Sequence, residues 1–339
     1  MSGFRCVLLV VLGCILCCRV DAAGRLNEFV LDGTESCVEI RRGSSAIRPT
    51  LGAVTNAATY SGRIAPGGLA VAWGTRFAEA GETHLAARTP LSRLLGRVQV
   101  LWRAADWDST IYGSSNRCGW RAAPLLYVGP DQINFQVPMF FYKPFSEEDG
   151  DGYGRFANFE GREYEFIVLR LLPDGVTRVS SNTFRLKVNS HAPEIFPNAL
   201  LAFPAWQTAA ALVPDQVLVA YLTGLGKISD HEPEGHIPPE PPWTTSYPTV
   251  IEYRTTLGAR IRRGFIYAGR APGFVGVDQI SFAVPPLPVA IGETVWLHIC
   301  TGADNADRCS EKGIPLPYRL SPAGMKPNPL LPNRKEPRQ

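Results

Sequence analysis

The sequence DQINFQVP at residues 131–138 occurs again as DQISFAVP at residues 278–285, starting 147 positions later at 278 rather than 131. In both copies large apolar residues alternate with polar or small ones, and a proline ends the run. This alternation indicates a β-strand with one buried face, and proline ends it because proline lacks the N–H donor. Each copy follows an apolar, partly aromatic run, at residues 125–128 and 265–268. The duplication therefore predicts two domains of similar fold.

Short alternating segments separated by Gly- and Pro-rich turns continue on both sides of each copy, and no stretch has a sustained 3.6-residue period. This pattern is typical of immunoglobulin-like β-sandwiches, and the repeat is longer than the ~20–50-residue units of solenoids and propellers. We expect an all-β fold with two tandem immunoglobulin-like β-sandwich domains, at residues 48–189 and 190–321. One helical turn is expected at residues 90–96, with Thr89 as N-cap and Gly96 as its end.

Length and composition agree with two folded domains. The chain has 339 residues, 45% hydrophobic and 19% charged, which excludes a disordered chain as a whole. The formal net charge is only +3. We find no dense Lys/Arg stripe that would neutralise several phosphates, so nucleic acid is not an expected partner.

Residues 1–23 have the features of a signal peptide. Arg5 precedes an apolar run at residues 6–18, which is shorter than the ~20 residues of a membrane-spanning helix. Val20-Asp21-Ala22 offers small residues for cleavage near Ala22 or Ala23. We therefore expect a protein of the cell envelope or the extracellular space, without a membrane span in the mature chain. Leu12-Gly13-Cys14 loosely matches a lipobox, so a lipoprotein is the alternative, although the apolar run before it is short.

Four cysteines remain after removal of this segment: Cys37, Cys118, Cys300 and Cys309. An even number in an exported chain indicates disulfides. Cys300 ends a predicted strand and Cys309 opens the next segment across a polar loop, so we favour Cys300–Cys309, which leaves Cys37–Cys118. Zinc is the alternative, but no Cys-x-x-Cys motif supports it.

Two flanking segments and two insertions surround the repeats. Residues 24–47 are predicted to be an N-terminal extension, and the Pro-rich, basic residues 322–339 a disordered tail. Residues 103–121 and 139–162 interrupt the first repeat. The second insertion contains an acidic cluster at residues 147–151. Calcium is one interpretation of this cluster, but without the alternating Asp loop and terminal Glu we expect a solvated turn.

Beyond the repeated strands, the chain contains further motifs in a fixed order: Val54-Thr55-Asn56-Ala57-Ala58, Ala65-Pro66-Gly67, Trp73-Gly74-Thr75, Ala123 to Val128, and in the second half Leu222 to Gly226 and Tyr267-Ala268-Gly269. Over residues 50–320 the chain resembles a family of acidobacterial secreted-protein C-terminal domains. The resemblance implies tandem immunoglobulin-like, TIG-type modules on exported proteins, with no catalytic residues to transfer. The chain departs from that family in its two insertions and its mature cysteines.

Known catalytic motifs are missing from the sequence. There is no Gly-x-Ser-x-Gly elbow and no phosphate-binding Gly-rich loop before a helix. His231 and His236 are the only close histidines, and neighbouring prolines exclude the helix that a His-Glu-x-x-His zinc site needs. We therefore expect no catalytic, cofactor or metal residues. The polar face of the first repeated strand, formed by Gln132, Asn134 and Gln136, is expected to be a wetted outer face rather than an interface.

The tryptophans divide by predicted element. Those in predicted strands, at positions 73, 102 and 296, are expected in the core. The possible ligand contacts are the loop residues Trp107, Trp120 and Trp243. Exposed loop aromatics stack on sugar rings or bind a protein partner, but they also fold back over the end of a sandwich.

These features favour a non-catalytic, exported structural or adhesive module, with a protein or glycan partner. One alternative is a carbohydrate-binding module that uses the loop tryptophans. A second is a hydrolase with an unrecognised pair of carboxylates, which requires Asp or Glu side chains to converge in one cleft.

Overall fold

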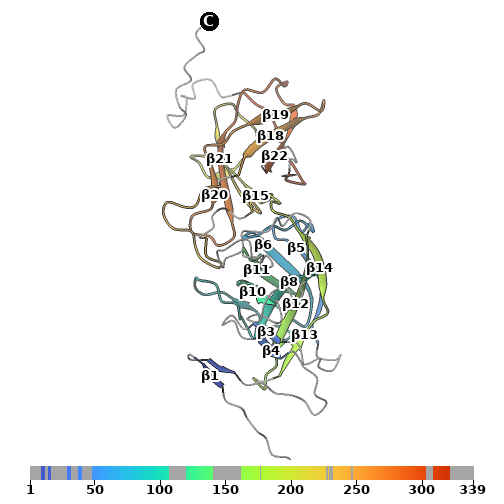
Figure 1. The fold of residues 1–339 in the computed structure, drawn as a ribbon. Helices are drawn as coiled ribbons and strands as arrows, with labels where there is room; N and C mark the ends of the chain where they lie inside the picture. Colours follow the sequence, from blue (N-terminus) through green and yellow to red (C-terminus); the bar gives the residue numbers. More distant parts are fainter. Residues whose placement is uncertain are drawn as a thin grey trace, which may run out of the picture.

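The computed structural model describes residues 48–106, 120–139, 162–175, 177–226, 228, 232–245, 247–302 and 308–320, together with the backbone of four short N-terminal strands. Every regular element in this part of the chain is a β-strand, and the strands form two β-sandwiches stacked end to end (Figure 1). The predicted fold class, two tandem immunoglobulin-like β-sandwiches, is therefore confirmed. Nothing in the described part forms a helix with the length and apolar character to span a bilayer.

The N-terminal strands pair as two small hairpins, β1 (Leu9–Val11) with β2 (Cys14–Leu16) and β3 (Phe29–Leu31) with β4 (Cys37–Glu39). The rest of the expected signal peptide, and the expected tail at 322–339, lie outside the described residues.

The first sandwich consists of two antiparallel sheets. One has the order β5 (Thr50–Asn56), β6 (Leu69–Thr75), β11 (Gln132–Gln136), β10 (Leu125–Val128), β7 (His84–Leu85). The other has the order β13 (Arg178–Ser180), β12 (Arg162–Leu171), β8 (Val98–Ala104), β9 (Arg121–Ala122), with β14 (Phe184–Val188) also paired to β12.

The second sandwich repeats this arrangement. One sheet has the order β16 (Gln207–Thr208), β15 (Glu194–Ala202), β17 (Val217–Thr223), β21 (Asp278–Ala283), β20 (Tyr267–Arg270). The other has the order β19 (Arg260–Arg263), β18 (Thr249–Thr255), β22 (Thr294–Thr301), β23 (Arg308–Cys309), with β24 (Ile314–Pro317) on β22. The duplicated sequence forms β11 and β21, which occupy the same place in their sheets.

The duplicated strands turn the same face into the two cores. Ile133 pairs with Ala72 and Ile280 with Ala220, and both isoleucines have an exposed fraction of 0%. One core is drawn from residues between 51 and 188 and the other from residues between 195 and 318. Complete burial of such a side chain contributes ~1.5–3 kcal/mol, so the period-two pattern has a direct energetic basis.

The helical turn predicted at residues 90–96 is wrong, because the structure has no helix there. The backbone groups of this segment bond to distant strands and loops instead. The Leu91 amide donates to the Gly235 carbonyl at 2.8 Å, and the Ser92 carbonyl accepts from the Leu125 amide at 2.8 Å. Tertiary bonds therefore override the local helix signal.

The strand tryptophans are not all in the core. Trp102 is buried in the first core, as predicted. Trp73 is half-buried outside that core, and its indole N–H donates to Thr55 Oγ1 at 3.0 Å. The expectation for Trp296 was also wrong. Its β22 neighbour Leu297 belongs to the second core, and side chains alternate along a strand, so Trp296 lies on the outer face.

The predicted Cys300–Cys309 disulfide is confirmed, with the two sulfurs 1.99 Å apart. Cys300 and Cys309 are direct cross-strand partners on β22 and β23. The predicted Cys37–Cys118 pair lies outside the residues whose side chains are described.

We expect Ile280→Ala to lower the free energy of unfolding by about 2–5 kcal/mol, because it removes buried methyl groups and leaves a cavity. The matched control is Ile266→Ala, at a residue 51% exposed, for which the expected change is within about 0.5 kcal/mol. Urea unfolding of both variants tests this. Equal losses in the two variants would contradict the placement of the duplicated strand.

Candidate functional site

The junction between the two sandwiches is formed by two short segments. One is the turn at residues 63–69 of the first domain, between β5 and β6. The other is the loop at residues 232–235 of the second domain. The Leu69 amide donates to Thr223 Oγ1 at 2.6 Å, and Thr223 Oγ1 donates to the Gly276 carbonyl at 3.1 Å. The Thr223 hydroxyl of the second domain thus links the start of β6, in the first domain, to Gly276 of the second domain.

Arg270, at the end of β20, is the central residue of the junction. Its guanidinium forms ion pairs with Glu232 and Asp278. Nη2 also donates to Glu232 Oε2 at 3.0 Å and to the Gly226 carbonyl at 3.1 Å. Arg270, Glu232 and Asp278 are 1%, 3% and 0% exposed. We call these three residues the Arg270 cluster. Buried charges are tolerated only when they are paired in this way.

The first domain closes over this cluster through Gly67. Gly67 has φ +75°, and a Cβ atom added there would overlap the Arg270 guanidinium. Glycine therefore serves two purposes at this turn, since it adopts the left-handed conformation without strain and leaves space for the arginine.

Gln136, the last residue of β11, bridges the two domains. Its Nε2 donates to the Gly67 carbonyl at 3.0 Å, and its Oε1 accepts from the Gly235 amide at 2.7 Å. Gln136 is 1% exposed. The prediction of a wetted outer face is therefore wrong for this residue, because the second domain covers that end of the strand.

Glu234 links the same loop to the first domain. It accepts from the Met139 amide at 2.7 Å and forms an ion pair with Arg93 at 2.8 Å. The loop at 232–235 therefore has one carboxylate on each side of the junction. Glu232 binds Arg270 of its own domain, and Glu234 binds groups of the other domain.

Burial and neighbouring charges shift the pKa of Arg270 and of Asp278. Burial would lower the pKa of Arg270, but the charges of Asp278 and Glu232 outweigh burial and raise it. Burial raises the pKa of Asp278 to about 6, although the Arg270 charge and the Leu225 amide oppose this shift. The guanidinium thus remains charged, and its partners supply the compensating negative charge.

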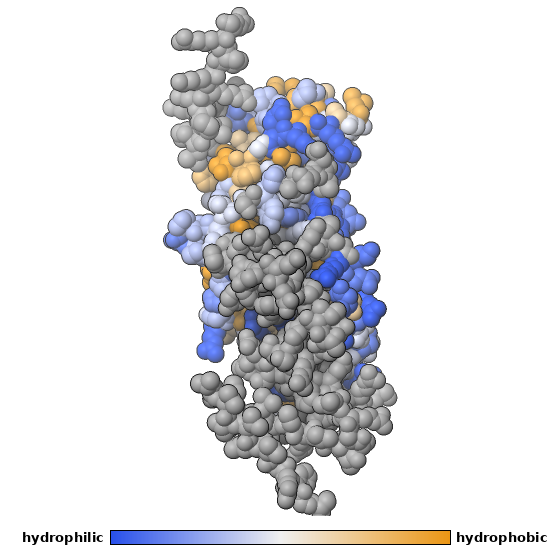
Figure 2. All heavy atoms as spheres, viewed as in Figure 1, coloured by the Kyte–Doolittle hydropathy of each residue, from blue (hydrophilic) through white to orange (hydrophobic). Residues whose placement is uncertain are grey.

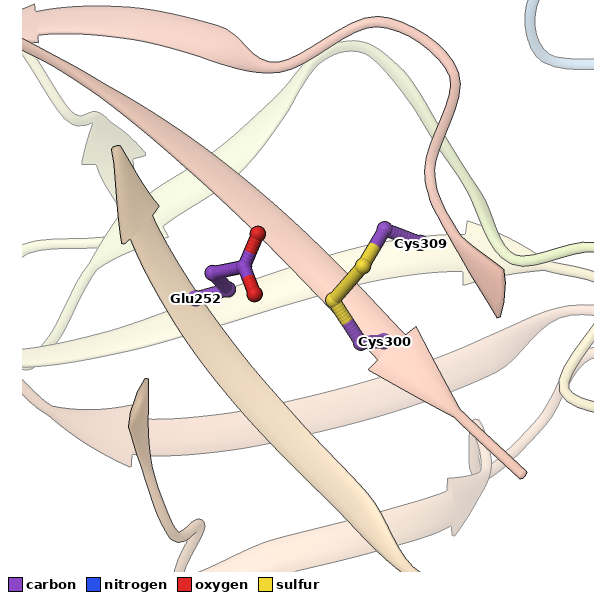
Figure 3. A group of neighbouring side chains, drawn as sticks. All are labelled: Glu252, Cys300 and Cys309. Carbon is purple, nitrogen blue, oxygen red and sulfur yellow. A yellow bond between two sulfur atoms is a disulfide. The ribbon is translucent and has the colours of Figure 1, made fainter. Parts of the chain in front are cut away.

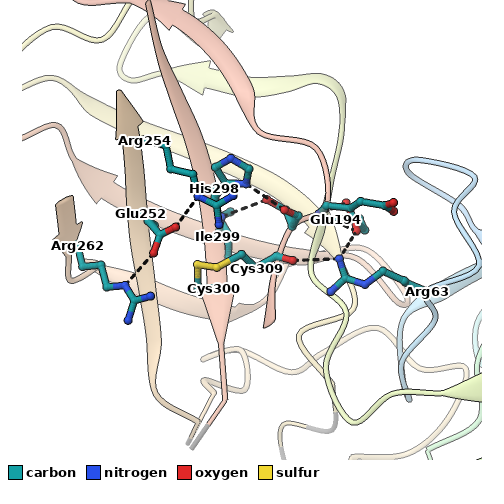
Figure 4. Close-up of a disulfide and its surroundings, with 11 residues drawn as sticks. Arg63, Glu194, Glu252, Arg254, Arg262, His298, Ile299, Cys300 and Cys309 are labelled. Atoms are coloured by element: carbon teal, nitrogen blue, oxygen red, sulfur yellow. Dashed lines mark hydrogen bonds and ion pairs between the residues drawn. A yellow bond between two sulfur atoms is a disulfide. The ribbon is translucent and has the colours of Figure 1, made fainter. Parts of the chain in front are cut away.

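A second ion pair crosses the junction next to the disulfide (Figure 4). Arg63 Nη1 lies 3.2 Å from Glu194 Oε1 and 3.0 Å from the Cys309 carbonyl oxygen. The Glu311 amide donates to Glu194 Oε1 at 3.1 Å. Glu194 has an exposed fraction of 0%. Two separate buried anchors therefore fix the orientation of one domain on the other.

Glu252 and the disulfide form a further close group (Figure 3). A Glu252 carboxylate oxygen and the sulfurs of Cys300 and Cys309 lie within 4.8 Å of one another. Both sulfurs are bonded in the disulfide, and Glu252 binds Arg254 at 2.6 Å and Arg262 at 2.8 Å. This donor set does not suit a metal ion, because its sulfur ligands are already used.

A small pocket of about 140 Å³ opens on the first domain. It is lined by Leu94, Arg97, Gln99, Leu169, Leu171 and Arg178. Ligand sites usually measure ~300–1,000 Å³, so this pocket is too small for a typical small-molecule ligand.

The three loop tryptophans are not brought together as an exposed set. Trp107 lies outside the described residues. Trp120 is 2% exposed, and the Arg103 guanidinium carbon lies 4.3 Å from its ring centroid. Trp243 packs, half-buried, against the second core, and its carbonyl accepts from the Arg270 amide at 3.0 Å. Trp120 therefore follows the alternative interpretation, in which a loop tryptophan folds back into the interior.

Of the close histidines, His231 lies outside the described residues, and the exposed His236 has Nδ1 2.9 Å from the Glu234 carbonyl oxygen. The acidic cluster at 147–151 also lies outside them. The carboxylates that do converge, Glu232 and Asp278, share Arg270 and are almost completely buried. Within the described residues, this pair binds an arginine and is buried away from solvent.

The alignment of the two repeats contained a signal for the Arg270 cluster. When the apolar runs at 125–128 and 265–268 are aligned, as the strand register also requires, Arg270 corresponds to Pro130, and Asp278 corresponds to Asp131. Asp131 is exposed, whereas Asp278 is buried. An arginine that appears in only one copy, eight residues before the shared aspartate, was the available clue. Glu232 has no such signal, because its loop is irregular.

No family model matches the chain, and no curated protein matches it in sequence. Solved structures do match, and three of them illustrate how weak the likeness is. The FN1–FN3 domains of chicken CNTN1 are 8% identical with a TM-score of 0.21, and the match covers 81% of this chain and 69% of that one. Dimeric latent PorU from Porphyromonas gingivalis is 12% identical with a TM-score of 0.25, covering 83% and 24%. A DUF4785 family protein from Legionella pneumophila is 6% identical with a TM-score of 0.24, covering 77% and 56%. At these scores the likeness carries no argument about function.

We expect Gly67→Ala to destabilise the chain more than Gly81→Ala does. Both glycines have positive φ, +75° and +82°, but an added Cβ meets Arg270 only at position 67 and meets nothing at position 81. Gly81→Ala therefore measures the backbone cost alone, about 1 kcal/mol. The excess loss in Gly67→Ala, measured by thermal unfolding, reports the close approach at the junction, and equal losses would contradict it.

We expect Glu194 to make stability pH-dependent. Burial raises its pKa from 4.5 to about 7, against the Glu311 amide and the Arg63 charge. The folded state thus binds this proton more tightly, so the stabilisation is complete below pH 4.5 and is lost as the pH rises to about 7. Asp278 titrates in the same direction, and His191, whose pKa burial lowers to about 4, in the opposite one.

Glu194→Gln removes this dependence and leaves the other groups in place. The difference in unfolding free energy between wild type and variant is therefore expected to fall by up to ~3 kcal/mol between pH 4.5 and 7, and to stay constant above. Urea unfolding across this range measures it. A difference that does not change with pH would contradict the buried position of Glu194.

Proposed function

We propose that the chain is a non-catalytic structural or adhesive module that is exported from the cytosol. In this proposal its two immunoglobulin-like domains act as one unit, and the second domain is presented at a fixed angle to the first. The mature chain begins near residue 24 and binds a protein or a glycan of the cell envelope.

The Arg270 cluster is the observation that supports this proposal. A flexible pair of domains needs only a linker, whereas this junction buries a guanidinium between two carboxylates and adds Gln136 and Glu234 as bridges. The ion pairs of Arg270 lie within the second domain and hold the loop at 232–235, whose Glu234 and Gly235 bond to the first domain, so the junction resists opening while that loop is held in place. A fixed orientation is useful to a protein that presents a surface to a partner.

The alternatives receive less support. A hydrolase requires accessible carboxylates, and Glu232 and Asp278 are buried with Arg270 between them. A carbohydrate-binding module based on the loop tryptophans requires exposed rings, and Trp120 is buried.

The test uses the full chain expressed in the exporting organism. After cell fractionation, the protein is expected in the envelope fraction or in the growth medium, and it should have lost its N-terminal segment. The purified mature chain, coupled to beads, is expected to retain envelope polymers in a saturable way. After prolonged incubation the retained polymers should have an unchanged size distribution by gel filtration.

Two results would overturn the proposal. Recovery of the unprocessed chain in the cytosol would remove export. Progressive shortening of an envelope polymer by the wild-type chain would show an enzyme. A variant with Glu232→Gln serves as the control for the junction, and it should retain less polymer at equal protein concentration.

A further inference from the structure

The β18–β19 hairpin concentrates positive charge at the end of the second domain that lies away from the first. Residues 249–263 contain four arginines and one glutamate, a formal charge of +3 that equals the net charge of the whole chain. Strongly hydrophilic side chains gather over these two strands (Figure 2). The arginines are Arg254, Arg260, Arg262 and Arg263.

Two of these arginines face each other directly. Arg254 on β18 is the cross-strand partner of Arg260 on β19. Like charges in directly opposite positions destabilise a sheet. Arg260 forms no hydrogen bond or ion pair with the residues that the structure describes. Folding alone thus gives no reason for this pair.

Glu252 fixes the direction of the neighbouring charges (Figure 4). It binds Nε of Arg254 at 2.6 Å and Nε of Arg262 at 2.8 Å, and it is completely buried. A guanidinium has five N–H donors, so a single bond through Nε leaves the Nη groups of Arg254 for another acceptor. The Glu252 carboxylate therefore fixes the positions of Arg254 and Arg262, and the hairpin keeps a net positive charge.

A row of directly paired residues runs from Arg260 across four strands of this sheet, β19, β18, β22 and β24. Arg260 pairs with Arg254, Arg254 with Trp296 on β22, and Trp296 with Pro315 on β24. Directly paired residues share one face of a sheet, and neighbouring strands lie ~4.8 Å apart, so the row is ~14 Å long. Arg260 and Pro315 are exposed, while Arg254 and Trp296 are half-buried. The row thus presents two cations followed by the flat indole ring of Trp296 and the apolar ring of Pro315.

Protection of the sheet edge explains part of this pattern. β19 is the edge strand of its sheet, and charged residues on an edge prevent pairing with another sheet. Arg254 and Trp296, however, belong to interior strands of the same sheet, where edge protection does not apply.

We propose that this face, formed by Arg254, Arg260 and Trp296, binds an acidic polysaccharide. A carboxylate or sulfate group of the polymer accepts from the guanidinium forks, and the next sugar ring stacks on the indole. The bound anion also relieves the repulsion between Arg254 and Arg260. Acidic peptides and anionic lipids share the negative charge, but neither offers a ring for Trp296. This inference names a partner for the module proposed above and rests on that function.

The test measures binding of the mature chain to polygalacturonate by isothermal titration calorimetry at low salt. Amylose is the neutral probe, polyglutamate the acidic peptide, and phosphatidylglycerol vesicles the lipid surface. Binding to polygalacturonate is expected to be the strongest and to weaken with added salt. Arg260→Gln should weaken it about tenfold, as expected for loss of one charge-assisted contact.

Arg88→Gln is the matched control, because it removes the same charge from an exposed loop of the first domain, and it should leave the affinity unchanged. Trp296→Ala should weaken binding to polygalacturonate but not to polyglutamate, and Trp296→Phe should restore much of the loss. Equal losses in Arg260→Gln and Arg88→Gln, tighter binding to polyglutamate or vesicles, or no binding to polygalacturonate would each overturn the proposal. If envelope retention persists in Arg260→Gln, the module function stands and only this partner is wrong.

Discussion

The ion pairs of Arg270 are the constraint on which the arrangement of this protein depends. Removing a charged guanidinium from water costs free energy unless opposite charges and hydrogen bonds replace its hydration. Glu232, Asp278 and the Gly226 carbonyl supply that replacement within the second domain. The first domain completes the burial through Gly67, which has no side chain to displace the arginine. The two domains therefore bury one charge jointly.

The duplication shows how a second domain acquires such a junction. Both copies retain the strand that starts with an aspartate, and both use it at the same position of the sheet. In the first copy Asp131 is exposed, and Pro130 stands where the second copy has Arg270. The same backbone therefore provides a free sheet end in one domain and a buried ion pair in the other. The pairing of the two copies also differs, since Arg270 pairs with Asp278 in the second domain, whereas the pairing of β10 with β11 ends at Val128 and Ile133.

The sequence predicted the parts of the structure that depend on local pattern. Alternation placed Ile133 and Ile280 in the cores, and the short polar loop predicted the Cys300–Cys309 disulfide. It did not predict what depends on contacts between distant segments. Gln136 follows the same alternation as Gln132, and only the approach of the loop at 232–235 buries it. Trp296 looked like a core residue because its neighbours are apolar, yet the same alternation places it on the outer face. The Arg254–Arg260 pair is visible only from the strand register.

A rigid junction and an exposed cationic face serve one purpose if the protein presents a binding surface at a fixed angle. The most direct measurement of the central claim is the distance between the two domains in solution. Double electron–electron resonance between spin-labelled residues at the exposed positions Lys187 and Leu257 reports it. The account predicts one narrow distance distribution in the intact chain, and a broad one when Glu232 is changed to Gln. A broad distribution in the unchanged protein would contradict the account.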